Sequence, residues 1–176
     1  LNLSDPVFQQ TLIDIQAWSG NHQYERGEIS SEEFLASLAK RMGLSYDFDV
    51  MKAGWNSFVG DVYPEMANLV RELKKITKVY TLSNINELHF EHITLRNPVF
   101  EEVHSFFASH LMGARKPETR IYEKLLNEIS CRPHEALFFD DNRDNIVEAK
   151  RIGIVAHQIS SPLTEIPKIL KELKII

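Results

Sequence analysis

Two adjacent aspartates, Asp140 and Asp141, follow directly after a short apolar run at 136–139. Such a run is typical of a buried parallel strand, and Asn142 after the pair is a favourable helix N-cap. Neighbouring carboxylates repel one another unless a cation or a proton intervenes, and a hard divalent ion bound through oxygen meets this need. We therefore predict a Mg²⁺ site, with one aspartate as direct ligand, the other in support, and Asn145 adding an amide oxygen or ordering a ligand. The alternative is that the aspartates only cap the helix.

A serine at another strand end and a lysine before a helix are the next candidates. The predicted strand at 78–82 runs into Ser83 and Asn84, and Lys116 precedes a helix that Pro117 opens. A hydroxyl with the following backbone amides can donate to a phosphoryl oxygen, and an ammonium can neutralise its charge. Taken singly, such residues are usually a cap or a solvated side chain. Together with the acidic pair they suit a phosphate and its metal.

The elements that must position these residues change in character at Pro64. Before it, the apolar spacing predicts only helices, at 5–18, 30–43 and 47–59, with a polar connection at 22–30. After it, helices alternate with strands predicted at 78–82, 105–109, 136–139 and 154–158. This alternation indicates an α/β fold, an open parallel Rossmann-like sheet with helices on both faces. Right-handed crossovers would bring Ser83, Lys116 and the acidic pair to the same sheet edge.

Length and composition exclude several classes of protein. The chain of 176 residues suits one domain, or one domain with a small insertion. Its net charge of -5, from 20 basic and 25 acidic residues without long runs, makes nucleic acid an unexpected partner. We find no apolar stretch long enough for a bilayer and no secretory leader, so we expect no membrane partner. The single cysteine, Cys131, fits a reducing cytosol, so a cytoplasmic location is expected. The sequence leaves the oligomeric state open.

Three segments together resemble the haloacid dehalogenase (HAD)-like hydrolase superfamily. VYTLSN, with Ser83, is similar to its second motif, and GARKPETRIY, with Lys116, to its third. FFDDNRDN, with Asp140, Asp141 and Asn145, is similar to its fourth. HQYERGEIS and the helices around it resemble the small helical cap of this superfamily. The combination looks most like bacterial sugar-phosphate phosphatases of the glucose-1-phosphatase type, and implies a cap at 1–62 and a Rossmann-like core at 63–176.

The resemblance also implies a covalent mechanism and a role for each matched residue. An aspartate attacks phosphorus, and water then cleaves the aspartyl-phosphate. Ser83 and Lys116 would hold the transferred phosphoryl group, with Asn84 as a neighbour. Mg²⁺ would be bound by Asp141, supported by Asp140 and Asn145. The cap loop would lie over the site, where Arg26 or His22 could bind hydroxyls or a second charge of a small phosphorylated substrate. The alternative is an ordinary solvated turn at Gly27.

The nucleophile of the first family motif is absent from these residues. No apolar strand ending in aspartate stands before residue 64, and the family places that strand centrally, between those ending at Ser83 and Asp140. We expect it on about 20 to 30 upstream residues, so that the 176 residues alone should not turn over. Two rivals stay open. One is a non-catalytic binding or regulatory module without the nucleophile, and the other is a metal-free haloacid dehalogenase, against which the acidic pair argues.

Overall fold

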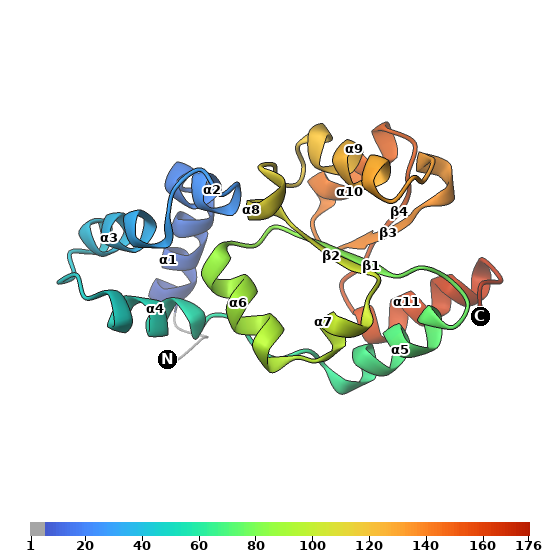
Figure 1. Ribbon diagram of the computed structural model, residues 1–176, viewed down its shortest axis with the longest axis horizontal. Helices are drawn as coiled ribbons and strands as arrows, with labels where there is room; N and C mark the ends of the chain where they lie inside the picture. The colour runs from blue at the N-terminus through green and yellow to red at the C-terminus, as the bar shows by residue number, and fades with distance from the viewer. Residues whose placement is uncertain (1–5) are drawn as a thin grey trace. The chain divides into compact units, whose positions relative to one another are not determined.

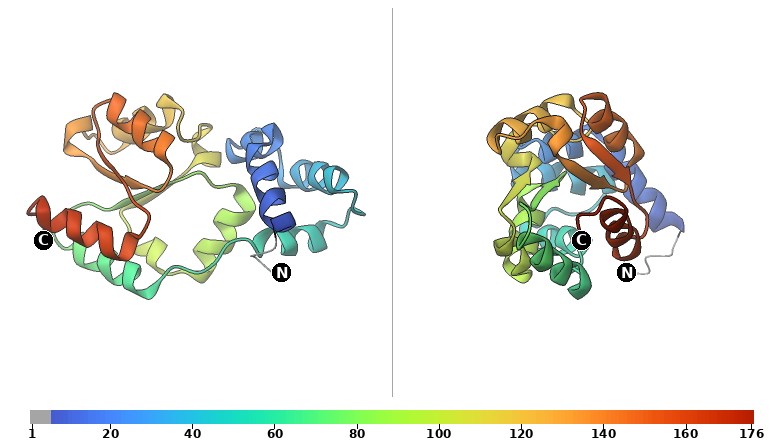
Figure 2. Two further views of the ribbon diagram at one scale, coloured as in Figure 1. Left: turned by 180° about the vertical axis from the view of Figure 1, so that it is seen from behind. Right: turned by 90° about the vertical axis from the view of Figure 1, so that its right-hand side faces the viewer.

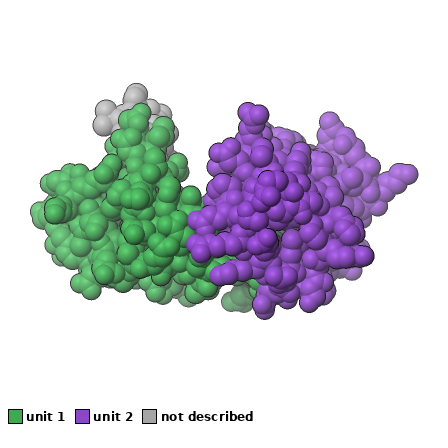
Figure 3. Space-filling view, turned by 90° about the horizontal axis from the view of Figure 1, so that it is seen from above, with its two compact units in different colours: residues 1–61, 80–101, 105–115 green, residues 62–79, 102–104, 116–176 purple. Residues whose placement is uncertain are grey.

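The structure, a computed structural model, describes residues 6–176 (Figure 1). Asp5, the first residue of the helix predicted at 5–18, lies outside the described residues. The chain divides into two compact units, which Figure 3 colours separately. Unit 1 contains the described residues up to Asp61 with Tyr80–Glu101 and Ser105–Arg115, and unit 2 contains Val62–Val79, Glu102–His104 and Lys116–Ile176. Each unit holds one pair of parallel strands among its helices.

The first four helices of unit 1 are α1 (Pro6–Ala17), α2 (Ser19–Glu25), α3 (Ser31–Met42) and α4 (Phe48–Asn56). A reciprocal capping box starts α3. Ser30 Oγ accepts from the Glu33 N–H at 3.2 Å, and the Glu33 carboxylate accepts from the Ser30 N–H at 2.8 Å. Gly43 ends the helix in the left-handed region, at φ 67°. Both boundaries confirm the helix predicted at 30–43. They could be predicted because hydrogen bonds between residues close in the sequence set them.

Helix α2 corrects the prediction of a polar connection at 22–30. The side chain of Tyr24 is 1% exposed, and its ring stacks on Phe34 with centroids 4.3 Å apart. Its hydroxyl shares a hydrogen bond of 2.7 Å with Ser31 Oγ. Burial of one aromatic residue thus outweighs the polar composition of the segment. As a result His22 lies on a helix, and only residues 26–30 form the connection to α3.

One hydrophobic cluster joins these helices to α6 (Glu87–Arg96). Its buried members are Ile15, Tyr24, Phe34, Leu35, Leu38, Trp55 and Leu88. The ring of Trp55 stacks on His89 with centroids 4.7 Å apart, and His89 Nε2 lies 2.9 Å from Trp55 O. Burial lowers the pKa of His89 to about 4, so the imidazole is neutral at pH 7 and Nε2 donates to the carbonyl. This contact fastens α4 to α6.

The strands of unit 1 are β1 (Tyr80–Ser83) and β2 (Ser105–Ala108), which pair in parallel with Ser83 opposite Ala108. Two four-residue helices, α7 (Val99–Glu102) and α8 (Ser109–Met112), stand on either side of β2 in the sequence. Neither helix was predicted, and α8 begins at Ser109, the last residue of the strand predicted at 105–109. A helix of one turn carries no periodic apolar pattern from which it could be recognised.

Unit 2 contains α5 (Pro64–Lys74), β3 (Leu137–Asp140), β4 (Val155–Gln158) and α11 (Pro162–Glu172), with α9 (Thr119–Glu128), a 3-10 turn (Pro133–Glu135) and α10 (Arg143–Arg151). β3 and β4 are parallel, and Asp140 lies opposite Gln158. Helices α5 and α11 lie side by side (Figures 1 and 2). Their shared core consists of Ile159, Ile166 and Leu170, against which Met66, Leu69, Leu73, Leu137, Phe139 and Ile169 pack.

The fold is therefore α/β with parallel strands, as predicted. All four predicted strands are present, and none of their ends differs from the prediction by more than two residues. Runs of apolar residues indicate that a strand exists better than they indicate where it ends. Within residues 6–176, hydrogen-bonded ladders join β1 to β2 and β3 to β4 only, so the strands form two pairs and not one continuous sheet. None of the described helices combines the length and the apolar character required to cross a bilayer.

Candidate active site

Lys116 and Asp140 form a buried ion pair in unit 2. Lys116 Nζ lies 2.6 Å from Asp140 Oδ2, and the two side chains are 10% and 5% exposed. Asp140 is the last residue of β3, whereas Lys116 precedes α9. Removing a charge from water costs several kcal/mol per ion unless a partner compensates it. The two residues therefore hold each other in place at the carboxyl end of β3.

Asp140 is also the acceptor for the start of α10. Its second oxygen, Oδ1, accepts from the Asn142 N–H at 2.8 Å and from Asn145 Nδ2 at 2.9 Å. Three donors, counting Lys116, thus occupy most of the roughly four acceptor positions of a carboxylate. Asp140 consequently orients Lys116 and Asn145 and has little capacity left for a metal ion.

Asp141 and Asn145 offer the oxygen atoms that a hard cation requires. Asp141 is exposed, and its backbone oxygen accepts from Gln158 Nε2 at 2.9 Å. Asn145 is 5% exposed, and its buried Oδ1 has no hydrogen-bond partner among residues 6–176. A buried acceptor without a partner is costly, and a cation or its bound water would satisfy it. The donor set beside this turn therefore fits Mg²⁺.

The protein side chains beside this turn supply only part of the ligand set of a metal ion. Among residues 6–176, no three His, Cys, Asp or Glu side chains come close enough to hold a metal ion by themselves. Mg²⁺ usually keeps several waters and binds one or two protein carboxylates together with substrate phosphate. Water and phosphate oxygens would therefore have to complete the coordination of an ion at Asp141.

Tyr122 supports the same cluster, and sequence reasoning missed it. The residue lies on α9, its side chain is fully buried, and its hydroxyl donates to the backbone oxygen of Asn145 at 3.0 Å. Burial, together with the negative charge of Asp140, raises the pKa of Tyr122. The hydroxyl therefore stays protonated and able to donate. Its spacing on the helix predicts only a core residue, and no local signal reveals the contact.

Ser83 and Asn84 stand at the carboxyl end of β1 in unit 1, where both are partly buried. The turn after them is fixed at Ile85, because Ser109 Oγ accepts from its N–H at 2.9 Å and donates to its carbonyl at 3.1 Å. The side chain of Asn86 then caps α6. The fixed turn and the capped helix start thus hold the backbone on the carboxyl side of Ser83 and Asn84.

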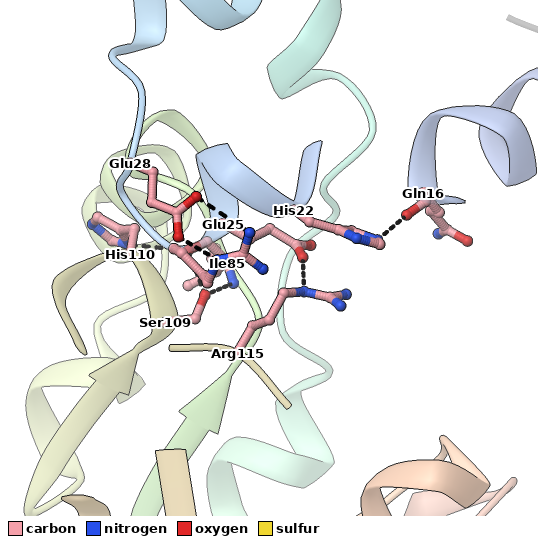
Figure 4. Close-up of polar contacts among 9 residues, drawn as sticks. Gln16, His22, Glu25, Glu28, Ile85, Ser109, His110 and Arg115 are labelled. Carbon is pink, nitrogen blue, oxygen red and sulfur yellow. Dashed lines mark hydrogen bonds and ion pairs between the residues drawn. The ribbon is translucent and has the colours of Figure 1, made fainter. Parts of the chain in front are cut away.

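His22 and Arg26, which are predicted to contact the substrate, form hydrogen bonds with neighbours in unit 1 (Figure 4). His22 Nε2 lies 2.8 Å from Gln16 O. Arg26 pairs with Glu28 through Nε at 2.6 Å and through Nη2 at 3.2 Å. Any ligand of these side chains must therefore compete with existing partners.

A second missed feature is an ion pair between residues 90 positions apart. Arg115 Nε donates to Glu25 Oε2 at 2.6 Å (Figure 4). The two side chains are 20% and 15% exposed. No pattern within a single sequence couples positions so distant, so only the folded chain reveals the contact.

The predicted site residues thus fall into two groups. The structure brings Lys116, Asp140 and Asn145 into one hydrogen-bonded cluster in unit 2, with Asp141 adjacent in the chain. Ser83, Asn84, His22 and Arg26 belong to unit 1. The meeting of the two groups at one sheet edge stays a prediction.

Fold and cluster together define a Rossmann-like α/β protein whose acidic turn is paired with a buried lysine. The chain belongs to the haloacid dehalogenase-like hydrolases, since the model of that family matches residues 32–153. The family resemblance of the three sequence motifs is thereby confirmed.

Relatives of known activity are similar along most of the chain. It is 30% identical over 156 residues to a sesquiterpene phosphatase of Aspergillus oryzae, covering 87% of this chain and 77% of that one. It is 26% identical over 142 residues to D-ribitol-5-phosphate phosphatase of Bacteroides thetaiotaomicron, covering 77% and 69%. The crystal structure of a HAD family enzyme from the same bacterium, in complex with magnesium and inorganic phosphate, matches with a TM-score of 0.78 at 26% identity, covering 86% and 80%.

Proposed function

We propose that the protein is a Mg²⁺-dependent phosphatase that hydrolyses a small phosphorylated metabolite, with a sugar phosphate as the first candidate. The observation that carries this proposal is the cluster of Lys116, Asp140 and Asn145 beside the exposed Asp141. It combines a cation for phosphate with oxygen donors for a metal. Family membership and two phosphatase relatives support the same chemistry.

Each residue of the cluster has a distinct task in this proposal. Asp141 would hold Mg²⁺ directly, and Asn145 would hold the ion or its water through the buried Oδ1. When bound, the ion supplies charge neutralisation for the phosphoryl oxygens. Lys116 shares this work from a position fixed by Asp140, because a preorganised charge costs no reorientation during the reaction. Ser83 and Asn84 would donate to the phosphoryl group from the end of β1.

The nucleophile in this proposal is an aspartate upstream of Leu1, which forms an aspartyl-phosphate that water then cleaves. Residues 1–62 would act as a helical cap and residues 63–176 as the core. His22 and Arg26 would lie on the cap near the leaving group. The substrate class rests on two relatives, a D-ribitol-5-phosphate phosphatase and a sesquiterpene phosphatase, whose leaving groups differ in polarity. A metal-free dehalogenase is disfavoured because it has no use for Asp141 beside an unpartnered amide oxygen.

The test is phosphate release from p-nitrophenyl phosphate by the full-length protein with its native upstream residues. We expect activity that EDTA abolishes and Mg²⁺ restores, and a loss of about 10³-fold in Asp141→Asn, the scale of removing one electrostatic contact to the transition state. Asp144→Asn is the matched control, because Asp144 is an exposed carboxylate in the same turn. Halide release from 2-chloropropionate without phosphate release, or equal activities of Asp141→Asn and wild type, would refute the proposal.

A further inference from the structure

Two contacts in unit 1 join the end of α2 to the segment after β2, and a third joins that segment to the turn after β1. Figure 4 shows the Glu25–Arg115 and His110–Ile85 contacts. Glu25 accepts from Arg115 Nε at 2.6 Å. Gly27 adopts a φ of +67°, and a Cβ at this position would lie 2.3 Å from His110 O. His110 Nδ1 in turn lies 2.9 Å from Ile85 O, two residues after Ser83. The turn after α2 is thus linked to the segments that follow β1 and β2.

Arg115 is the residue immediately before Lys116. The segment from Gly113 to Arg115 joins α8 to the lysine, and its middle residue, Ala114, is 0% exposed. Within the described part of the chain, Glu25 is the only hydrogen-bonding partner of the Arg115 side chain. Two successive cations are therefore each held by a carboxylate, Arg115 by Glu25 and Lys116 by Asp140.

Burial distinguishes the Glu25–Arg115 pair from the surface ion pairs of the same unit. Its side chains are 15% and 20% exposed, whereas Asp61 and Arg96 are 56% and 53% exposed although their contact is bidentate. Exposed pairs contribute little because water and salt screen them, and partly buried pairs are screened much less. Of these two pairs, Glu25–Arg115 is the better suited to hold a backbone segment.

We propose that Glu25 and Arg115 are positioning residues that fix the backbone from which Lys116 reaches the phosphoryl group. The inference rests on the proposed function. It gives Glu25, the last residue of α2, a positioning role that requires no contact with the substrate. Loss of Glu25 frees segment 113–116 on one side of the lysine, and a misplacement of about 1 Å in an active site can cost up to about 100-fold in rate.

Steady-state kinetics of the full-length protein test this, with Mg²⁺ and two substrates of different leaving group, p-nitrophenyl phosphate and acetyl phosphate. Glu25→Gln and Arg115→Gln should each lower kcat about tenfold, with KM little changed and with equal losses on both substrates. The double variant should lose no more than either single variant, since both break one contact. A residue that contacts the leaving group would instead raise KM on one substrate.

Asp61→Asn serves as the matched control, because it breaks an exposed ion pair in the same unit and should keep wild-type kcat. Hydrogen–deuterium exchange provides a second measurement. Amides of residues 109–116 should exchange faster in Glu25→Gln than in wild type or in Asp61→Asn. If wild type shows no phosphatase activity, the proposed function alone is refuted. The exchange measurement then still tests whether the Glu25–Arg115 pair holds residues 109–116. The inference would be overturned by an unchanged kcat in the single variants or by a loss of kcat in the double variant equal to the product of the single losses. It would equally be overturned by unchanged amide exchange of residues 109–116 in Glu25→Gln.

Discussion

At the scale of single residues, the central feature is a buried lysine for which we propose a role in phosphate chemistry. Lys116 is 8% exposed and its charge is compensated by Asp140. Its Nζ also lies 5.5 Å from the centroid of the Phe138 ring, within range of a cation–π contact. A lysine used only for phosphate would not need burial of this kind. The site is therefore built into the core of unit 2.

Lys116→Met should consequently lower both activity and stability. We expect a loss of about 10³-fold in kcat and of about 3 kcal/mol in unfolding free energy, because Asp140 is left as a buried charge without its ion-pair partner. Urea unfolding measures the second effect. Lys116→Met with Asp140→Asn removes both charges and should regain much of the stability while staying inactive. Unfolding of Lys116→Met at the wild-type urea concentration would contradict this account.

His89 makes the stability of unit 1 depend on pH. Its pKa is about 4 in the folded protein, against an ordinary value of 6.5, because burial disfavours the charged ring. The unfolded chain therefore binds the proton first, and stability should fall as pH decreases from about 6.5 to about 4. Between pH 7 and pH 5 the loss is about 2 kcal/mol. In His89→Phe, which keeps an aromatic ring against Trp55, urea unfolding should show a smaller pH dependence; an equal dependence would refute the assignment.

At the scale of elements, two glycines with the same backbone conformation have different surroundings. Gly27 and Gly43 each follow a helix with φ +67°. A Cβ on Gly43 would meet no atom within 4 Å, whereas a Cβ on Gly27 would lie 2.3 Å from His110 O. Gly43 is thus required only for its conformation, and Gly27 also for close approach of two backbones.

Alanine substitution separates these two effects. Gly43→Ala should cost about 1 kcal/mol of unfolding free energy, the penalty of a left-handed conformation for a residue with a Cβ. Gly27→Ala should cost about 1 to 3 kcal/mol more, because the new methyl group forces the His110 segment to move. Thermal unfolding of both variants provides the comparison. Equal losses would show that the close approach at Gly27 is absent in solution.

At the scale of the whole molecule, the metal site proposed at the carboxyl end of β3 would couple ligand binding to folding. A ligand that binds only the folded state adds about 2.7 kcal/mol at 100 times its dissociation constant. Added Mg²⁺ should therefore raise the thermal unfolding midpoint of the full-length protein, and EDTA should reverse the effect. Asp141→Asn should remove the increase, and Asp144→Asn should keep it. An equal increase in Asp141→Asn would place the ion elsewhere.

The sequence alone determined most of the elements, and it predicted the residues that form the buried cluster in unit 2. Ser30 with Glu33, Gly43 and Asn142 set helix ends through hydrogen bonds within a few residues, which local sequence encodes. Runs of apolar residues indicated all four strands. The order of the motifs that contain Lys116 and Asp140 indicated the family to which the chain belongs. Residues 22–25, predicted as part of a polar connection, are helical because Tyr24 is buried against another helix.

Only the tertiary structure decided how these residues are held. Lys116 and Asp140 lie 24 positions apart, Tyr122 and Asn145 lie 23 apart, and Glu25 and Arg115 lie 90 apart. The same residue types are common on solvated surfaces, where they carry no such role. Their partners follow from burial and from the path of the backbone, and these are properties of long-range packing that no local pattern of residues specifies.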